Sequence, residues 1–288
     1  MRTSVISVDV SRTRAQAVKG ITFDVWETML FEKSGDGEQR NLARCRNVSQ
    51  ALHKLGVEVS VEQVASALDK TVALLLEAWK ENRDLTHVDQ LRALIRFAWK
   101  GSAKIKSEWL RELSDAYVSP IHEVPPYLNP DISGVLESLS GEKQLGIICN
   151  TGITPGFALK EFLSRQKVAE YFDVMIFSDE VGVRKPEPRI FRLAARKLGV
   201  KPNETVHIGD NIMCDVWGAK LAGFKAIHLA GIEGRDKIAE DDPKSLVKIS
   251  RSLGILRGPQ MPADQTITVL GKAIEAIRKI ENSTKFSE

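Results

Sequence analysis

The sequence has few cysteines and no long apolar segment. Its three cysteines, Cys45, Cys149 and Cys214, are odd in number and far apart, which fits neither a disulfide framework nor a zinc-binding spacing. No apolar run approaches the length that spans a bilayer; TVALLL at residues 71–76 is short and flanked by charged residues. Residues 1–20 also lack the apolar core and cleavage site of a secretory signal. We therefore expect a cytoplasmic protein that is not bound to a membrane.

An excess of charge of either sign is missing too. The 41 basic and 38 acidic residues are interspersed along the chain and give a formal net charge of +3. Proteins that bind nucleic acid through a basic face carry a larger, clustered excess, so we expect no nucleic-acid partner. The length of 288 residues and the apolar content of 43% are ordinary for a globular protein with one large domain, or one domain with a substantial insertion.

The periodicity of apolar residues differs between parts of the chain. Residues 38–117 show the spacing of helices and no strand pattern, and predict about four amphipathic helices. Ser60 begins one of them with a capping-box pattern, and Gly56 and Gly101 follow predicted helix ends. Elsewhere, short buried runs alternate with helical patterns, which is typical of βαβ units in a parallel sheet. The predicted strands are GITFDV, QLGIICN, DVMIFS, TVHIGD and KAIHLAG.

The predicted fold class is α/β, a doubly wound parallel sheet with an inserted all-helical domain. We expect an N-terminal extension at residues 1–19, an α/β core formed by residues 20–34 and 120–288, and a helical insertion at residues 35–119. Residues 232–265 show no clear pattern. The stretch ITVLGKAIEAIRKI at 267–280 predicts either a strand followed by a helix or a single helix.

Polar residues follow four of the predicted strands. They are Asp24; Cys149, Asn150 and Thr151; Ser178, Asp179 and Glu180; and Asp210. Ligands of doubly wound sheets collect at the carboxyl ends of the strands, so we expect these residues to converge there. Lys185 lies in a short loop after the third group, and Asp215 follows Asp210 by five residues. Several carboxylates and one lysine suit a hard cation and a phosphoryl group.

Four segments, taken in order, resemble the motifs of the haloacid dehalogenase-like (HAD) hydrolase superfamily. They are FDVWETMLF, IICNTG, SDEVGVRKPEPRIF and HIGDNIMCDVWGAKLAG. The last is the most specific, because it combines a glycine-aspartate after a strand, a second aspartate five residues on, and an xGAxxAG helix. The resemblance covers roughly residues 20–230 and implies a hydrolase whose inserted helices form a cap between the first and second motifs.

The resemblance also implies roles for the residues that match these motifs. Asp24 would be the nucleophile, and a carboxylate suits this role because it is ionised at neutral pH. Mg²⁺ would be bound by Asp24, Asp210 and the Trp26 backbone carbonyl, with Asp215 helping directly or through water. Lys185 would neutralise developing charge. The expected substrate contacts are Thr28, Cys149, Asn150, Thr151 and Trp26.

Trp26 departs from the pattern of most phosphatases in the superfamily. They place a second aspartate there, which protonates the leaving group and activates water. Loss of such a group costs about 10²–10⁴ in rate, and less when the leaving group is a weak base. The superfamily's haloacid dehalogenases instead carry an aromatic residue at this position, work without metal, and replace the first aspartate of the fourth motif. This chain keeps Asp210 and Asp215, so its first and fourth motifs favour different activities.

Three further details bear on that choice. Cys149 replaces the usual serine or threonine of the second motif, and a thiol is a poor hydrogen-bond donor, so Thr151 could substitute for it. Glu27 replaces a small glycine. Its charge could perturb the site or serve as an acid, and the second role is disfavoured because adjacent residues of a strand face opposite sides. No arginine clearly matches the dehalogenases' substrate arginine; the candidates are Arg40, Arg44 and Arg46.

Several of these residue types also have ordinary structural roles. Asp215 could be a helix N-cap. His207 and His228 lie within predicted strands and are expected in the core or sheet, and Cys149 and Cys214 as small buried residues. The insert's tryptophans are expected to pack in the cap or at its interface. They are Trp79, Trp99 and Trp109.

Three functional hypotheses follow. The first is Mg²⁺-dependent hydrolysis of a small phosphorylated metabolite through an aspartyl-phosphate on Asp24, with a preference for good leaving groups. The second is a metal-independent 2-haloacid dehalogenase with an ester intermediate on Asp24. The third is an inactive HAD-fold protein that binds a partner. For either enzyme we expect a small phosphorylated or halogenated substrate and a monomer or homodimer.

Overall fold

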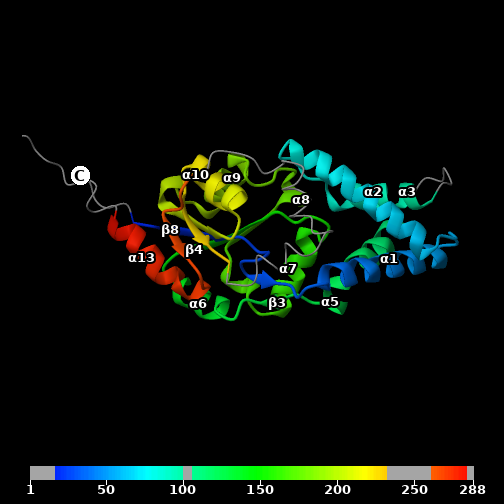
Figure 1. Ribbon diagram of the computed structural model, residues 1–288, viewed down its shortest axis with the longest axis horizontal. Helices are drawn as coiled ribbons and strands as arrows, with labels where there is room; N and C mark the ends of the chain where they lie inside the picture. The colour runs from blue at the N-terminus through cyan, green and yellow to red at the C-terminus, as the bar shows by residue number, and fades with distance from the viewer. Residues whose placement is uncertain (1–16, 100–105, 232–260, 284–288) are drawn as a thin grey trace, which may run out of the picture.

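The computed structural model describes residues 17–99, 106–231 and 261–283 (Figure 1). The predicted helix end at Gly101, most of the N-terminal extension and most of the segment without pattern lie outside these residues. The described chain forms an α/β core and a bundle of helices that extends from one side of it (Figure 1). None of the helices in these ranges combines the length and apolar character that a bilayer span requires.

A six-stranded parallel sheet forms the centre of the core. Its order is β5-β4-β1-β6-β7-β8, and all five predicted strands are present in it. The strands are β1 (Gly20–Phe23), β4 (Gln144–Cys149), β5 (Val174–Phe177), β6 (Thr205–Gly209), β7 (Lys225–Leu229) and β8 (Gln265–Ile267). In the register of the central strands, Phe23 is opposite both Ile147 and Ile208. The residues that follow β1, β4 and β6 therefore meet at one edge of the sheet.

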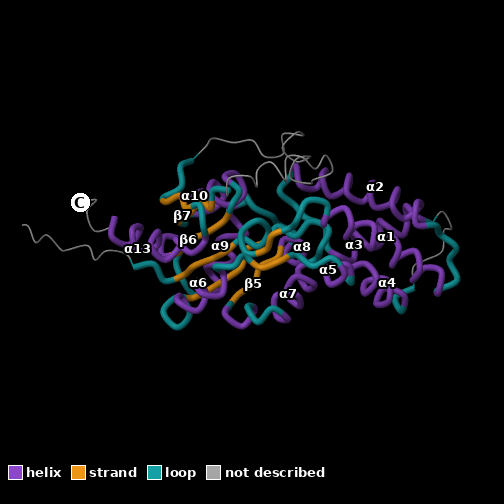
Figure 2. The backbone as a smooth tube through the Cα atoms, turned by 60° about the horizontal axis from the view of Figure 1, so that its bottom comes forward, coloured by secondary structure: helices purple, strands orange, loops and turns teal. Residues whose placement is uncertain are grey.

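Helices cover both faces of the sheet, as a doubly wound fold requires (Figures 1 and 2). One face packs against α6 (Ile132–Leu139), α7 (Gly156–Arg165) and α13 (Ala273–Ser283), and the other against α9 (Pro188–Leu198) and α10 (Gly218–Ala222). Side chains of a strand alternate between its faces, so Ile147 lies in the first apolar cluster and Ile148 in the second. Shorter helical turns are α5 (Pro120–Glu123), α8 (Ser178–Val181), a π-helical turn (Ile212–Trp217), and 3₁₀ turns at Ala169–Tyr171, Pro202–Glu204 and Leu270–Lys272.

Four helices make the inserted cap and share a separate apolar core. They are α1 (Asp36–Lys54), α2 (Val61–Lys80), α3 (His87–Ala98) and α4 (Trp109–Val118). The capping box at Ser60 is confirmed, because its side chain accepts from the Gln63 N–H while Gln63 accepts from the Ser60 N–H. Gly56 adopts φ 80° just after α1, as expected for a helix stop. Trp79 is buried in this core, and Trp99 and Trp109 pack at its edge with ring centroids 6.3 Å apart.

Two features of the fold were not specified by the apolar pattern. A two-stranded antiparallel sheet pairs β2 (Leu30–Phe31) with β3 (Tyr127–Leu128), where the chain leaves the core for the cap and returns. Strands of two residues are too short to show a period, and only the tertiary structure brings them together. The C-terminal stretch is a strand followed by a helix, but its strand begins at Gln265, before the apolar run.

The close approach of α7 to the end of β5 makes Gly156 a test of core packing. A Cβ at this position would lie 2.4 Å from Cβ of Phe177. We expect Gly156→Ala to lower the free energy of unfolding by about 1–3 kcal/mol because the helix must shift. Gly134 on α6 is the matched control, since a Cβ there meets no atom within 4 Å, and alanine should stabilise this helix by about 0.5–1 kcal/mol. Unfolding in denaturant measures both, and equal stability of the two variants would contradict the packing.

Candidate active site

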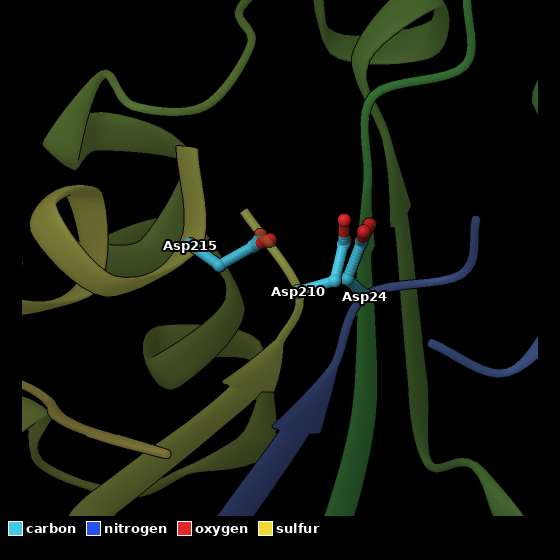
Figure 3. Close-up of side chains that lie close together, drawn as sticks. All are labelled: Asp24, Asp210 and Asp215. Carbon is cyan, nitrogen blue, oxygen red and sulfur yellow. The ribbon is translucent and has the colours of Figure 1, made fainter. Parts of the chain in front are cut away.

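The two central strands deliver two carboxylates to the same edge of the sheet. Asp24 follows β1 and Asp210 follows β6, its neighbour in the sheet, and the Asp24 N–H donates to the Ile208 carbonyl at 2.9 Å. Figure 3 shows their side chains next to each other and pointing the same way, with Asp215 turned toward them from the following helical turn. One oxygen from each of the three carboxylates lies within 4.8 Å of the other two. The predicted convergence of these aspartates is therefore present.

Asp215 reaches the cluster because of two local features of the fourth motif. Gly209 has no side chain, and a Cβ there would lie 2.3 Å from Cγ of Asp215, so only glycine leaves room for this carboxylate. The N-cap of the helical turn is Asn211, whose Oδ1 accepts from the Met213 and Cys214 N–H groups at 3.0 and 2.9 Å. The alternative interpretation of Asp215 as an N-cap is thus wrong, and its carboxylate is turned inward.

Lys185 connects the carboxylates. Its Nζ donates to Oδ1 of Asp24 and to Oδ1 of Asp215, both at 2.6 Å, and its side chain is 1% exposed. Its main chain is fixed by Asn150 at the end of β4: Nδ2 of Asn150 donates to the Lys185 carbonyl at 3.0 Å, and the Lys185 N–H donates to Oδ1 of Asn150 at 2.8 Å. Both polar groups of the Asn150 side chain thus position the lysine.

The cluster carries three carboxylates against one ammonium, and their pKa values reflect this imbalance. Burial raises the pKa of Asp210 well above its usual range, and the charges of Asp215, Asp24 and Glu27 raise it further. Burial raises the pKa of Asp24 to about 6, although Lys185 opposes the shift. Burial would also raise the pKa of Asp215, but Lys185 and His207 outweigh it and hold the pKa low. Ionisation is therefore disfavoured at Asp24 and Asp210, where the protein supplies too little positive charge.

This arrangement fits a hard divalent cation. Within the described ranges, no residue donates a hydrogen bond to the Asp210 carboxylate, which is partly buried and lies beside the carboxylates of Asp24 and Asp215. Mg²⁺ prefers such oxygens and needs only one or two carboxylates, because it keeps several of its waters. The oxygens of Asp215 already accept from Lys185, His207 and the Asn211 N–H. Asp24 and Asp210 are thus suited to direct contact with a cation, and Asp215 to contact through water.

The backbone after Asp24 turns sharply and does not continue as a strand. The Val25 carbonyl accepts from the N–H groups of Met29 and Leu30, each at 2.8 Å, and Glu27 has φ 58°, in the left-handed region. Glu27 is therefore not part of a strand, and its charge raises the pKa of Asp210, which agrees with the expectation that it could perturb the site. No glycine or asparagine marks this turn, and a glutamate with positive φ is uncommon, so the sequence gives little warning of it.

The other residues expected to contact the substrate differ in their burial and in their hydrogen bonds. Thr28 is fully buried, and its Oγ1 has no hydrogen-bond partner among the described residues. Trp26 is half-buried against the main apolar cluster, and the centroid of its ring lies 5.9 Å from Cζ of Arg40. Cys149 is fully buried as expected, and burial raises its pKa well above the usual range, with a contribution from Asp24, so its thiol is protonated. The Thr151 N–H donates to Oγ of Ser178 at 3.0 Å.

A hydrogen-bonded chain from the cap reaches this second motif. Ser178 Oγ–H donates to Oδ2 of Asp84 at 2.5 Å, and Asp84 lies in the cap between α2 and α3. Asp84 also accepts from Nε1 of Trp79 at 3.0 Å. Sequence analysis missed Asp84, since a single aspartate in a polar loop gives no signal. His207 is buried in β6, as expected, and it also contacts the cluster: its Nε2 lies 3.1 Å from Oδ1 of Asp215, and its Nδ1 lies 2.9 Å from Oγ1 of Thr22.

The arginines considered as substrate ligands are mostly engaged elsewhere. Arg40 donates twice to the Val124 carbonyl, at 2.8 and 3.0 Å, and pairs with Glu32. Arg44 donates to the Tyr117 carbonyl at 2.9 Å and to Asn41. Arg46 is exposed. None of the three has the free, inward-facing guanidinium that a halocarboxylate would need.

The protein is similar to curated phosphatases along most of its length. It is 29% identical over 231 residues to a glyceraldehyde 3-phosphate phosphatase from Methanopyrus kandleri, with 79% of this chain and 89% of that protein covered. It is also 29% identical over 240 residues to a phosphoglycolate phosphatase from Salmonella typhi, with 80% and 88% covered. The crystal structure of a 2-haloacid dehalogenase from Pseudomonas syringae pv. Tomato DC3000 covers 91% of this chain and 99% of its own, with a TM-score of 0.62 and 21% identity, which shows a shared fold.

The family comparison covers the same region as the four motifs. The family model of haloacid dehalogenase-like hydrolases matches residues 18–223, from the start of the sheet through the fourth motif and its helix. This match includes the cap insertion and every residue of the carboxylate–lysine cluster. The chain therefore belongs to the haloacid dehalogenase-like hydrolase family.

Proposed function

We propose that the protein is a Mg²⁺-dependent phosphatase that hydrolyses small phosphorylated metabolites through an aspartyl-phosphate on Asp24. The observation that carries the proposal is the pairing of Asp24 with Asp210 beside Lys185. Asp24 contacts an ammonium at 2.6 Å, while Asp210 has no protein donor among the described residues. A dehalogenase that works without metal has no need of a second carboxylate beside its nucleophile. The named phosphatases among the relatives favour the same choice.

In this mechanism, a carboxylate oxygen of Asp24 attacks phosphorus while the bond from phosphorus to the leaving oxygen breaks. Lys185 keeps Asp24 ionised, because its ammonium opposes the rise in pKa that burial causes. Water then attacks the aspartyl-phosphate and releases inorganic phosphate with Asp24 regenerated. Mg²⁺, held by Asp24 and Asp210 with Asp215 behind water, would neutralise negative charge on the phosphoryl oxygens. Thr28, with its unpartnered Oγ1, and the backbone near Asn150 and Thr151 would contact those oxygens.

Trp26 restricts the substrates that such a site can use. An indole neither protonates a leaving alkoxide nor activates water, so the rate depends on how weak a base the leaving group is. Carboxylates leaving acyl phosphates and aryl oxides are weak bases. We therefore infer a preference for substrates of this kind over simple alkyl phosphates.

The nucleophile is tested by substituting it with its neutral isostere. We expect the purified protein with Mg²⁺ to release phosphate from acetyl phosphate and para-nitrophenyl phosphate, and Asp24→Asn to abolish release because an amide is not a nucleophile. Asp69, exposed on α2, provides the control Asp69→Asn, which should keep full activity. Phosphate release that survives in Asp24→Asn would refute the mechanism. No release across a broad metabolite panel by the unaltered protein would instead support an inactive, partner-binding protein.

The metal requirement separates the phosphatase from the dehalogenase hypothesis. At about 100 times its dissociation constant, Mg²⁺ should stabilise the folded protein by about 2.7 kcal/mol, which is a rise of about 5 °C or more in melting temperature. Asp210→Asn should lose both this rise and phosphate release. Chloride release from 2-chloropropionate in the presence of a chelator, unaffected by Asp210→Asn, would establish the dehalogenase instead.

The role of Lys185 is tested through stability as well as activity. Lys185→Met leaves buried carboxylates without their counter-charge, and we expect a loss of about 3–5 kcal/mol in the free energy of unfolding. The folded-state pKa of Asp24 is already raised to about 6, and without the ammonium it rises further. The pKa of Asp215 loses the contribution that holds it low and rises as well. The folded variant therefore binds more protons than the unfolded chain over a wider range, and its stability should fall more steeply than that of the unaltered protein as pH increases from about 4 to 8. Lys220→Met, which breaks the peripheral ion pair with Asp264, is the control and should cost about 1 kcal/mol or less. A pH profile of Lys185→Met parallel to that of the unaltered protein would contradict the coupling.

A further inference from the structure

Arg184 is a buried arginine at the junction of cap and core whose guanidinium is not satisfied by the described protein. Its side chain has a relative exposure of 6%, and its Nε and Nη1 are fully buried without a hydrogen-bond partner in the described ranges. A guanidinium has five N–H donors, and buried donors without acceptors are rare in native proteins because each is costly. Burial lowers the pKa of Arg184, which agrees with a cation that lacks a close counter-ion. An anion bound there would supply the missing acceptors.

The guanidinium is held in place although it is unpaired. It stacks on the ring of Trp79, with its Cζ 4.0 Å from the ring centroid. Its main chain is tied to the cap, because the Arg184 N–H donates to the Asn82 carbonyl at 3.1 Å and Val183 bridges to Arg83. A pre-positioned guanidinium loses little freedom when it binds a ligand. These contacts join residues 82–84 of the cap to residues 182–184 of the core, here called the cap–core junction.

The nearest acidic residue does not act as the acceptor. Asp84 lies at the same junction, but its Oδ1 accepts from Nε1 of Trp79 and the Leu85 N–H at 3.0 and 2.9 Å, and its Oδ2 accepts from Ser178. No ion pair joins Asp84 to Arg184. The carboxylate contributes a favourable charge to Arg184 without saturating it.

Arg184 also borders the catalytic cluster. It directly precedes Lys185, so the two Cα atoms are about 3.8 Å apart across a trans peptide. Trp79, on which the guanidinium stacks, donates to Asp84, which accepts from Ser178, whose Oγ in turn accepts from the Thr151 N–H of the second motif. Arg184 therefore lies next to both the second and the third motif.

We propose that Arg184 binds a second anionic group of the substrate, a carboxylate or a second phosphate, and so favours phosphate esters or anhydrides that carry one over those that do not. The inference rests on the proposed phosphatase function and names its substrate class. The planar fork of arginine matches both oxyanions with two parallel hydrogen bonds. A substrate analogue with a neutral amide in place of the carboxylate would place its NH₂ group against an N–H of the guanidinium. At a buried site, such a mismatch of two donors discriminates strongly against the analogue.

Binding of non-hydrolysable ligands tests the inference without relying on turnover. Calorimetry with Mg²⁺ present would compare phosphonoacetate with phosphonoacetamide, which differ only in the charged group. We expect phosphonoacetate to bind the unaltered protein about 10- to 100-fold more tightly, the range for a hydrogen-bonded ion pair. Methylenebisphosphonate distinguishes the two kinds of anionic group. If it binds more tightly than phosphonoacetate, the group is a second phosphate; if it binds more weakly, the group is a carboxylate. Equal affinity for all three ligands would overturn the inference, whatever the fate of the catalytic proposal.

Variants of Arg184 complete the test. Arg184→Gln should bind phosphonoacetate and phosphonoacetamide equally. Arg184→Lys keeps the charge and should retain part of the preference, and it replaces Arg184→Gln if the neutral variant fails to fold. Arg83→Gln removes an exposed arginine at the same junction that pairs with Glu81, and its ligand preference should not change. An undiminished preference in Arg184→Gln, or an equal loss in Arg83→Gln, would show that Arg184 only packs against Trp79.

Discussion

The ammonium of Lys185 is the interaction on which the site depends. It is fully buried and bonded to two carboxylates that come from different strands, Asp24 after β1 and Asp215 beyond β6. Without it, the buried carboxylates of Asp24 and Asp215 would have oxygens within 4.8 Å of each other and no ammonium to balance their charge. Its attraction is incomplete, because Asp210 keeps a raised pKa and has no donor of its own among the described residues. That shortfall of positive charge is the physical reason for proposing a cation.

Much of this arrangement could be predicted, because it follows from chain order and from the geometry of parallel strands. A polar residue after each buried run must lie at the carboxyl edge of the sheet, and the alternation of strands and helices fixes that the runs are parallel. Asp24 and Asp210 are therefore predicted to lie together, with Lys185 in the loop beside them. The helical insertion was equally clear, because its apolar period is long and uninterrupted.

The rest depended on contacts that have no local signature. Glu27 adopts a left-handed conformation that its residue type does not favour, so the residues themselves do not indicate the sharp turn after β1. The Asn150 side chain could have contacted a substrate, and only the tertiary structure shows that it holds the Lys185 backbone at both ends. The bonds of Asp84 to Ser178 and of His207 to Asp215 likewise join residues far apart in sequence. The spacing of apolar residues indicates which face of a helix or strand is buried, but it does not indicate which polar atoms bond to each other.

The loop that carries Lys185 is held from two sides, and this ties the cap to the chemistry. From the core, Asn150 clamps its main chain; from the cap, the Asn82 carbonyl accepts the preceding N–H, that of Arg184. A second connection runs from Asp84 through Ser178 to the Thr151 N–H in the second motif. If the cap moves to admit a substrate, both connections must break or stretch, and the positions of Lys185 and Thr151 change with them. In the conformation described here the cap is docked, so the geometry that pairs Lys185 with Asp24 belongs to the docked state.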